Sequence, residues 1–375
     1  MGFPTRDVEL RLDLTNRCNL RCVMCSHGYE TEPSPAEHAC ISLDWFQRVI
    51  GELLPRVNIL NLSVGYEPLL NPDLCEILAL CRRYRVPQVV LTTNLLPLTD
   101  KVAAALTGGA VHLLHVSLDA GNRQVYDMIR QKGDFDRAVA HVQKIQRLKI
   151  LKKSRYPRIV FNYVLMNINF APLREFIDLT HRLGIREINC AELRIPHNYR
   201  KDLLPLGSRG LPADFDLENQ LIDYRAPEVR GRLIELVRYA WEKGILLNVP
   251  YHFELNMPGL FGRQQQRIRH LWRKSTLMTW RAKIGFLVSY AKNNFRTRRA
   301  PCSLPWRQLV INPAGDVLPC CSWSGSPTMG NIHTAPLSRI WNNERYAAVR
   351  AGLQQNDLPA ACENCIFSTK GRHGI

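Results

Sequence analysis

The sequence predicts an α/β protein built around a parallel β-sheet. Residues 8–190 alternate between short apolar runs and amphipathic stretches, a pattern typical of parallel strands joined by helical crossovers. A cysteine-rich loop, and no glycine-rich phosphate turn, follows the first apolar run, which disfavours a doubly wound dinucleotide-binding sheet. The chain has 375 residues and is 46% apolar, so it can form one large domain and a smaller one.

Six strands are expected, with helices between most of them. The strands are predicted at Val8–Leu14, Val57–Val64, Gln88–Thr93, Val111–Leu118, Arg158–Met166 and Arg186–Cys190. The helices are predicted at Leu43–Leu54, Pro72–Arg83, Phe135–Leu148 and Ala171–Leu183. Gly184 ends the last helix in the usual C-cap position. In parallel sheets joined by helical crossovers, functional side chains gather at the carboxyl ends of the strands, so the residues that follow each strand are the candidate site residues.

Three cysteines, Cys18, Cys22 and Cys25, follow the first strand within eight residues. This spacing lets one loop direct three thiolates to a single [4Fe-4S] cluster, which normally has four thiolate ligands. One iron is then left without a protein ligand, and an open coordination position allows a metal centre to bind and activate a substrate. The alternative is a zinc site, but zinc loops favour paired C-x-x-C units and this triplet has no adjacent fourth ligand.

The C-x3-C-x2-C spacing resembles the signature of the radical S-adenosylmethionine (SAM) superfamily, in which it follows the first strand of a (β/α)6 partial barrel. The resemblance implies a TIM-like partial barrel whose open iron binds the amino and carboxylate groups of SAM. Electron transfer to the sulfonium then releases a 5′-deoxyadenosyl radical that abstracts a hydrogen atom from the substrate. The family commonly has an aromatic residue before the third cysteine, where this chain has Met24; this adaptable apolar side chain can still cover the adenine or ribose.

The segment after the second strand, residues 63–70, resembles the family's GGEP motif. Tyr66 occupies the place of the second glycine, which bears on how closely the backbone approaches the methionine part of SAM. The resemblance assigns Glu67 to the ammonium group of SAM, which a carboxylate can bind through charge-assisted hydrogen bonds. The alternative is a plain turn made by Gly65 and Pro68.

The next two strand ends carry hydroxyl, amide and guanidinium groups. Thr93 and Asn94 belong to a segment similar to the family's TTNG turn and are expected to bind cofactor, with a plain turn or helix cap as the alternative. Ser117 and Arg130 match a family arrangement in which a serine and an arginine hold the carboxylate of SAM. Arginine presents a bidentate fork to a carboxylate and serine adds a short donor; the alternative is a surface arginine and a strand-end serine. Asp119 is expected to be a turn or helix-cap residue.

The C-terminal cysteines indicate a second metal centre. Cys302, Gly315 and Cys320 form a C-x12-G-x4-C pattern, and a C-x-x-C unit follows at Cys362 and Cys365. This resembles the SPASM and twitch extensions of radical SAM enzymes and implies an auxiliary [4Fe-4S] cluster held by the four cysteines. Four thiolates saturate such a cluster, so an electron-relay role is expected. A structural zinc site is the alternative, and Cys321 is either spare or an alternative ligand.

The positive charge of the chain is concentrated in one segment. The net charge is +17, and residues 255–315 contain no Asp or Glu but twelve Arg and Lys residues. Apolar residues recur from Trp280 to Ala291 at helical spacing beside these cations. Three interpretations stay open: a helix packed on the barrel, a helix on an anionic membrane surface, and nucleic-acid binding, which no recognised motif accompanies.

The expected domains are a radical SAM partial barrel (1–195), a crossover and helix that complete the barrel region (196–250), a basic amphipathic insertion (251–300) and a small α+β auxiliary-cluster domain (301–375). No signal peptide or apolar run of about 18 residues occurs. A cytoplasmic location is therefore expected, either free or peripheral to the inner membrane face, and the twelve cysteines are interpreted mainly as metal ligands of a reducing compartment.

The expected activity is that of a radical SAM oxidoreductase. A fully ligated auxiliary cluster can accept the second electron from a substrate radical, which favours dehydrogenation of a sugar, cyclitol or lipid-linked alcohol. The alternatives are a peptide maturase or an epimerase, and, in another class, a non-enzymatic metal protein that binds nucleic acid. Peptide maturases often have a leader-binding domain before the barrel. The first strand begins near Val8, so no such domain is expected here and the peptide maturase is the less favoured alternative. An external electron donor such as flavodoxin or ferredoxin is implied; no catalytic base or hydrogen donor is identified.

Overall fold

The structure is a computed structural model. It describes residues 8–29, 40–196, 198–203, 210–250, 302–312, 314–321, 323, 327–355 and 357–363. The predicted basic insertion and Cys365 lie outside these residues. Within them, no helix is long and apolar enough to cross a membrane.

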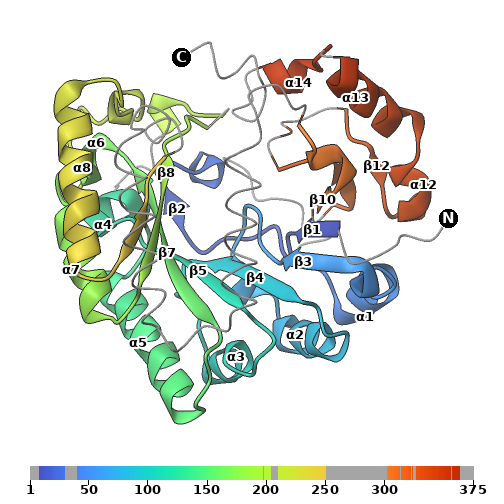
Figure 1. Ribbon diagram of the computed structural model, residues 1–375, viewed down its shortest axis with the longest axis horizontal. Coiled ribbons are helices and arrows are strands. Elements are labelled where there is room, and N and C mark those ends of the chain that lie inside the picture. The colour runs from blue at the N-terminus through green and yellow to red at the C-terminus, as the bar shows by residue number, and fades with distance from the viewer. Residues whose placement is uncertain are drawn as a thin grey trace.

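A curved ten-stranded sheet organises the molecule, in the order β12-β11-β10-β1-β3-β4-β5-β7-β8-β9 (Figure 1). All neighbouring pairs from β10 to β9 are parallel. The sheet is open, and its end strands are β12 and β9. The bounds are β1 (Val8–Leu12), β3 (Val57–Asn61), β4 (Gln88–Thr93), β5 (Leu113–Ser117), β7 (Arg158–Leu165), β8 (Glu187–Glu192), β9 (Leu246–Asn248), β10 (Gln308–Ile311), β11 (Asp316–Leu318) and β12 (Gly330–Asn331). All six predicted strands are therefore confirmed, with ends that differ by a few residues.

Helices cover the outer side of this sheet (Figure 1). Their bounds are α1 (Leu43–Trp45), α2 (Leu74–Arg83), α3 (Asp100–Leu106), α4 (Arg123–Ile129), α5 (Phe135–Leu151), α6 (Asn167–Phe170), α7 (Leu173–Arg182), α8 (Pro227–Glu242), α12 (Leu337–Trp341), α13 (Glu344–Gln355) and α14 (Ala360–Glu363). The predicted helix at Leu43–Leu54 is only partly right. Its α-helical part ends at Trp45 and widens into a π-helical turn, Phe46–Ile50, in which the Gly51 amide donates to the Phe46 carbonyl.

The C-terminal domain begins as a continuation of the main sheet. β10 pairs in parallel with β1, with Glu9 opposite Gln308 and Leu12 opposite Ile311. β11 and β12 then extend the sheet in antiparallel pairs. The sequence predicted a small α+β domain here but did not indicate this pairing, because it joins segments about 300 residues apart. The segment that carries the C-terminal cysteines is thereby attached to the strand that leads into the cysteine loop.

The two faces of the sheet differ in polarity. Phe161 and Tyr163 of β7 pack on Phe176 of α7, with ring centroids 5.3 and 4.7 Å apart. Successive side chains of a strand point to opposite faces, so Asn162 faces away from the helices. The register places Asn162 in one row with three polar neighbours on adjacent strands, Ser117, Asn189 and Asn248. We call these four half-buried residues the polar row. A sheet buried on both faces would be apolar throughout, so the polar row marks a face adapted to polar contacts.

Candidate active site

The cysteine loop is held by β2 (Arg21–Cys22), a short strand that pairs with β6 (Arg130–Gln131). Cys18, Cys22 and Cys25 form no disulfide bond among the described residues. The Cys25 amide donates to the Cys22 carbonyl over 3.1 Å, which closes the loop. Gly28 is required three residues later, because a Cβ there would lie 2.6 Å from the Cys22 carbonyl oxygen. Met24 is partly buried and packs, like Cys18 and Cys25, against the hydrophobic core.

Asp13 fixes the loop after β3 to the end of β1. Its Oδ1 accepts hydrogen bonds from the backbone amides of Val64, Gly65 and Tyr66 at 2.7, 3.0 and 3.4 Å. Burial raises the pKa of Asp13, and these three amides and His27 partly oppose that shift. Sequence reasoning did not identify Asp13. The sequence does contain an indication of its role, because Asp13 is a carboxylate near the end of an apolar strand pattern.

His27 holds the same loop from the other side. Its Nε2 donates to the Gly65 carbonyl over 3.1 Å, and its ring centroid lies 4.1 Å from that of Tyr66. Tyr66, which replaces a glycine of the family motif, therefore stacks on a residue of the cysteine loop. The loop at residues 63–67 and the cysteine loop form one unit, and sequence reasoning missed this contact because the two residues are far apart in the chain.

Glu67, Thr93 and Asn94 come together at the carboxyl ends of β3 and β4. The Glu67 carboxylate accepts hydrogen bonds from Thr93 Oγ1 (2.6 Å), the Asn94 amide (2.8 Å) and the Leu69 amide (3.1 Å). Glu67 is only 2% exposed. This burial raises its pKa to about 7, although the three hydrogen bonds favour the charged form. The site therefore holds a carboxylate whose charge changes near neutral pH.

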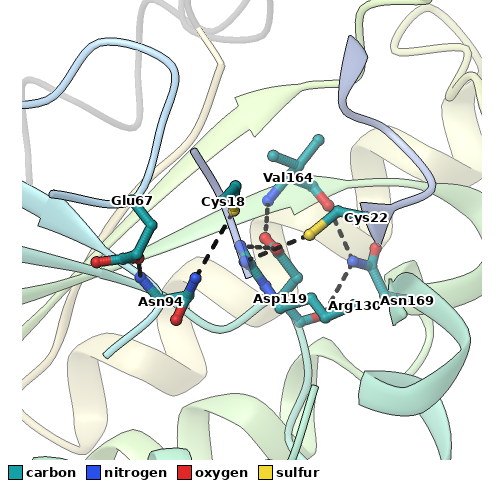
Figure 2. A network of polar contacts seen from close by, with 8 residues as sticks. All are labelled: Cys18, Cys22, Glu67, Asn94, Asp119, Arg130, Val164 and Asn169. Carbon is teal, nitrogen blue, oxygen red and sulfur yellow. Dashed lines mark hydrogen bonds and ion pairs between the residues drawn. The ribbon is translucent and has the colours of Figure 1, made fainter. Parts of the chain in front are cut away.

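Asn94 connects this carboxylate to the cysteine loop. Its Nδ2 donates to Asn19 Oδ1 over 2.9 Å. The same Nδ2 lies 4.0 Å from Cys18 Sγ (Figure 2). Asn94 also forms a turn, the alternative role expected for it from the sequence, since its Oδ1 accepts from the Leu96 amide. Thr93 does the same for the Leu95 amide. Both residues thus shape the turn and contact site residues.

Arg130 lies beneath the cysteine loop and is only 6% exposed, so the alternative of a surface arginine is wrong. Its Nη2 lies 2.5 Å from Asp119 Oδ2, and its Nη1 lies 3.8 Å from Cys22 Sγ (Figure 2). Its Nε has no hydrogen-bond partner among the described residues. Asp119 is not the helix cap, because the Asn122 side chain caps α4. Ser117 ends β5 on the polar face. The described polar partners of Arg130 are Asp119 and Cys22.

The C-terminal cysteines differ in burial. Cys320 is buried and Cys321 is exposed, while Cys302 and Cys362 are intermediate. The glycine of the predicted pattern is structurally required: Gly315 has φ +84°, and a Cβ there would lie 2.4 Å from the His333 ring. Because Cys365 lies outside the described residues, the four-cysteine set stays a prediction.

The residues around Cys22 suit an iron–sulfur cluster. Among the described residues, no three His, Cys, Asp or Glu side chains are arranged to hold one metal ion; in a cubane cluster each thiolate binds its own iron. Burial raises the pKa of the Cys22 thiol to about 12, and the charge of Arg130 opposes this shift. A thiolate at this buried position therefore requires positive charge beside it. Arg130 supplies part of that charge.

Two family models match the chain. Residues 12–180 match the radical SAM superfamily, and residues 302–366 match SPASM, an iron-sulfur cluster-binding domain. Among curated proteins, the PqqA peptide cyclase of Gluconobacter oxydans is 24% identical over 97% of this chain and 84% of its own length. A probable GTP 3',8-cyclase of Methanocaldococcus jannaschii is 28% identical over 47% of this chain, which spans about half of that relative (56%). The mycofactocin maturase MftC of Mycobacterium tuberculosis is 30% identical over 47% of this chain and 42% of its own length.

Two solved structures share the fold along almost the whole chain. SuiB of Streptococcus suis superposes with a TM-score of 0.61 at 16% identity, covering 92% of this chain and 68% of SuiB. The protein anSMEcpe with bound AdoMet superposes with a TM-score of 0.61 at 14% identity, covering 97% of this chain and 88% of that protein. At these identities the similarity shows the fold alone: an open partial barrel followed by a small C-terminal domain.

Proposed function

Because the chain belongs to the radical SAM superfamily and carries a C-terminal SPASM iron–sulfur domain, we propose that it modifies a peptide substrate by radical chemistry. The cofactors of this enzyme are SAM and [4Fe-4S] clusters, which together supply the 5′-deoxyadenosyl radical. This proposal replaces the expected dehydrogenation of a sugar, cyclitol or lipid-linked alcohol, for which the comparisons provide no support.

The observation that carries the peptide proposal is the extent of the similarity. The relative that matches over 97% of this chain is named a peptide cyclase, and its similarity therefore includes both the barrel and the C-terminal domain. The matched part of the GTP 3',8-cyclase covers 47% of the chain. A structure of SuiB bound to its precursor peptide covers 92% of this chain at a TM-score of 0.58. A shared two-domain arrangement favours a shared class of substrate.

The polar row supports the same class. Asn248 Nδ2 donates a hydrogen bond to Asn189 Oδ1 over 2.7 Å. Asn162 Oδ1 accepts from His115 Nδ1 over 3.0 Å. Side-chain amides offer both a donor and an acceptor, which matches the alternating donors and acceptors of a peptide backbone. The row begins at Ser117, one of the proposed SAM-binding residues, and crosses the face of the sheet away from it. A substrate on this row would lie next to SAM.

The cofactor-binding roles follow from the site. We assign Cys18, Cys22 and Cys25 to the radical-generating cluster, and Glu67 to the ammonium group of SAM. The assigned binders of the SAM carboxylate are Ser117 and Arg130, whose Nε is unpartnered among the described residues. Further assignments are Met24 for the adenosine, Thr93 and Asn94 for holding Glu67 in place, and Cys302, Cys320, Cys362 and Cys365 for the auxiliary cluster. An external donor such as flavodoxin or ferredoxin would supply the electron.

The test measures formation of 5′-deoxyadenosine by the reconstituted, reduced enzyme with SAM. Extracts of the host are added as a low-mass soluble fraction, the same fraction after protease digestion, and a lipid extract. Stimulation by the soluble fraction that disappears on digestion is expected. Stimulation that survives digestion, or stimulation by lipid alone, would overturn the peptide proposal in favour of a small-molecule or lipid-linked substrate.

A matched set of variants separates the substrate surface from the radical-generating site. Asn189→Ala and Asn248→Ala are expected to reduce the stimulation by peptide and to leave the unstimulated rate of SAM cleavage unchanged. Cys22→Ala is expected to abolish both rates. Equal stimulation in the asparagine variants and the unaltered enzyme would show that the polar row does not contact substrate.

A further inference from the structure

We propose that Arg130 raises the reduction potential of the radical-generating cluster through its contact with Sγ of Cys22, and that Asp119 positions Arg130 for this purpose. The inference rests on the cluster assignment to Cys18, Cys22 and Cys25 and is independent of the substrate. It gives Arg130 a role that precedes SAM binding, because the contact exists within the protein itself.

The backbone brings Arg130 and Cys22 together. The two residues are partners in the antiparallel pair of β2 and β6, and the Val23 amide donates to the Ile129 carbonyl over 3.0 Å beside them. Nη1 of Arg130 then lies 3.8 Å from Cys22 Sγ (Figure 2). The arginine side chain is only 7% exposed, so little water screens its charge from the sulfur.

Asp119 keeps the guanidinium in this orientation. Its Oδ2 lies 2.5 Å from Arg130 Nη2, its Oδ1 accepts from the Val164 amide over 2.6 Å, and its carbonyl accepts from Asn169 Nδ2 over 3.1 Å. The residue is fully buried, and its φ of +59° lies in the left-handed region that non-glycine residues rarely adopt. Both the side chain and the backbone of Asp119 are therefore fixed from β7 and α6, so Arg130 pivots little.

The direction of the effect follows from charge. Reduction adds negative charge to the cluster, and a cation or an N–H donor next to a ligand sulfur stabilises that charge. Hydrogen bonds to the sulfurs and nearby charge are among the factors that set the potentials of such clusters. Nη1 of the guanidinium contacts the Cys22 sulfur directly, whereas the Asp119 carboxylate binds Nη2. The net influence at Cys22 is positive, and the reduced state becomes easier to reach.

The first experiment is an EPR-monitored redox titration of the reconstituted holoenzyme. The signal that changes when SAM is added identifies the radical-generating cluster and separates it from the auxiliary one. The double variant Asp119→Asn/Arg130→Gln removes both charges together, so no unpaired charge stays buried. We expect its midpoint potential to shift to more negative values, and Arg130→Lys to recover part of that shift. Tyr126→Phe is the control, because the Tyr126 hydroxyl is buried with no hydrogen-bond partner among the described residues. The midpoint potential of the cluster should not change in this variant.

An unchanged potential in a double variant with full iron content would overturn the proposal. A second measurement needs no substitution and therefore does not depend on how the variants fold. Holoenzyme labelled with ¹⁵N only in its arginines is reduced and examined by pulsed EPR for a weak nitrogen coupling to the SAM-responsive cluster. We expect such a coupling from Nη1 of Arg130 before SAM is added. Its absence would show that no arginine contacts the cluster and would also overturn the proposal.

Discussion

The carboxylate of Asp13 lies 2.7 Å from the backbone nitrogen of Val64, a residue 51 positions later in the chain. This contact ties the end of β1, which leads into the cysteine loop, to the loop that carries Glu67. The proposed cluster ligands and the proposed ligand of the SAM ammonium group therefore share one support.

Replacing Asp13 tests that support. Asp13→Ala removes the buried carboxylate that accepts from the backbone amides of Val64, Gly65 and Tyr66, and the free energy of unfolding is expected to fall by about 1–3 kcal/mol, since hydrogen bonds to a charged acceptor are lost. Asp13→Asn keeps an oxygen at the same place and should lose less. SAM affinity should weaken in the same order, because Glu67 follows this loop. Chemical denaturation and equilibrium SAM binding provide the two measurements; equal values for alanine, asparagine and aspartate would contradict the assigned role.

The ionisation of Glu67 predicts a pH dependence of SAM binding. Its pKa is about 7 in the folded protein, against 4.5 for the ordinary residue. Only the charged carboxylate attracts an ammonium group, so SAM should bind more tightly as pH rises toward and just above 7. Glu67→Gln should bind SAM more weakly and lose this dependence. A glutamine variant with the same pH profile would assign the titration to another group.

The raised pKa of Glu67 also affects the stability of the SAM-free protein. SAM binding should strengthen as pH rises, whereas the contribution of Glu67 to stability should decrease. Because the folded state holds the Glu67 proton more tightly than the unfolded state does, the contribution of Glu67 to stability is largest below about pH 4.5 and falls as pH rises through about 7. Relative to Glu67→Gln, the unaltered protein should therefore lose unfolding free energy across this interval. Parallel unfolding curves for the two proteins at all pH values would contradict the assignment.

The auxiliary cluster should depend on Cys320 and not on its neighbour. Cys320 is buried, whereas Cys321 is exposed and its backbone amide is bound to Gln308 of β10 over 3.1 Å. In anaerobically reconstituted protein, Cys320→Ala should lower the iron content from about eight to about four atoms per chain. Cys321→Ala should retain all of them. The reverse result would identify Cys321 as the ligand.

Gly121 is expected to be irreplaceable because the backbone of α7 packs directly against it. A Cβ at this position would lie 2.4 Å from the Phe176 nitrogen, and backbone cannot move aside as a side chain tip can. Gly121→Ala should therefore lower the melting temperature. Gly231 in α8 is the matched control, since nothing lies within 4 Å of a Cβ there; Gly231→Ala should stabilise the helix by about 0.5–1 kcal/mol. Equal effects of the two substitutions would contradict this account.

The sequence alone predicted the six strands of residues 8–190 correctly and located the candidate site at their carboxyl ends. Gln88–Thr93 is confirmed at both ends. Glu67, Thr93 and Asn94 contact one another because they lie at or just after the carboxyl ends of neighbouring parallel strands, which share one edge of the sheet. Helices α3 and α4 were not predicted. Both are short, seven residues each, and a helix of two turns shows too little periodicity to be recognised locally.

What the sequence determined by itself is local: the order of the strands, the loops that follow them, and the kinds of side chain at their ends. Periodicity and motif spacing depend on neighbours along the chain, and so they can be read from it. The tertiary structure alone decided which of these side chains are paired. Asp13 with the loop of Glu67, His27 with Tyr66, Asp119 with Arg130, and β10 with β1 are contacts between distant segments. Such pairs form only when the sheet and its crossovers bury them together, and burial is what makes a charge or a hydrogen bond strong enough to shape the chemistry of the site.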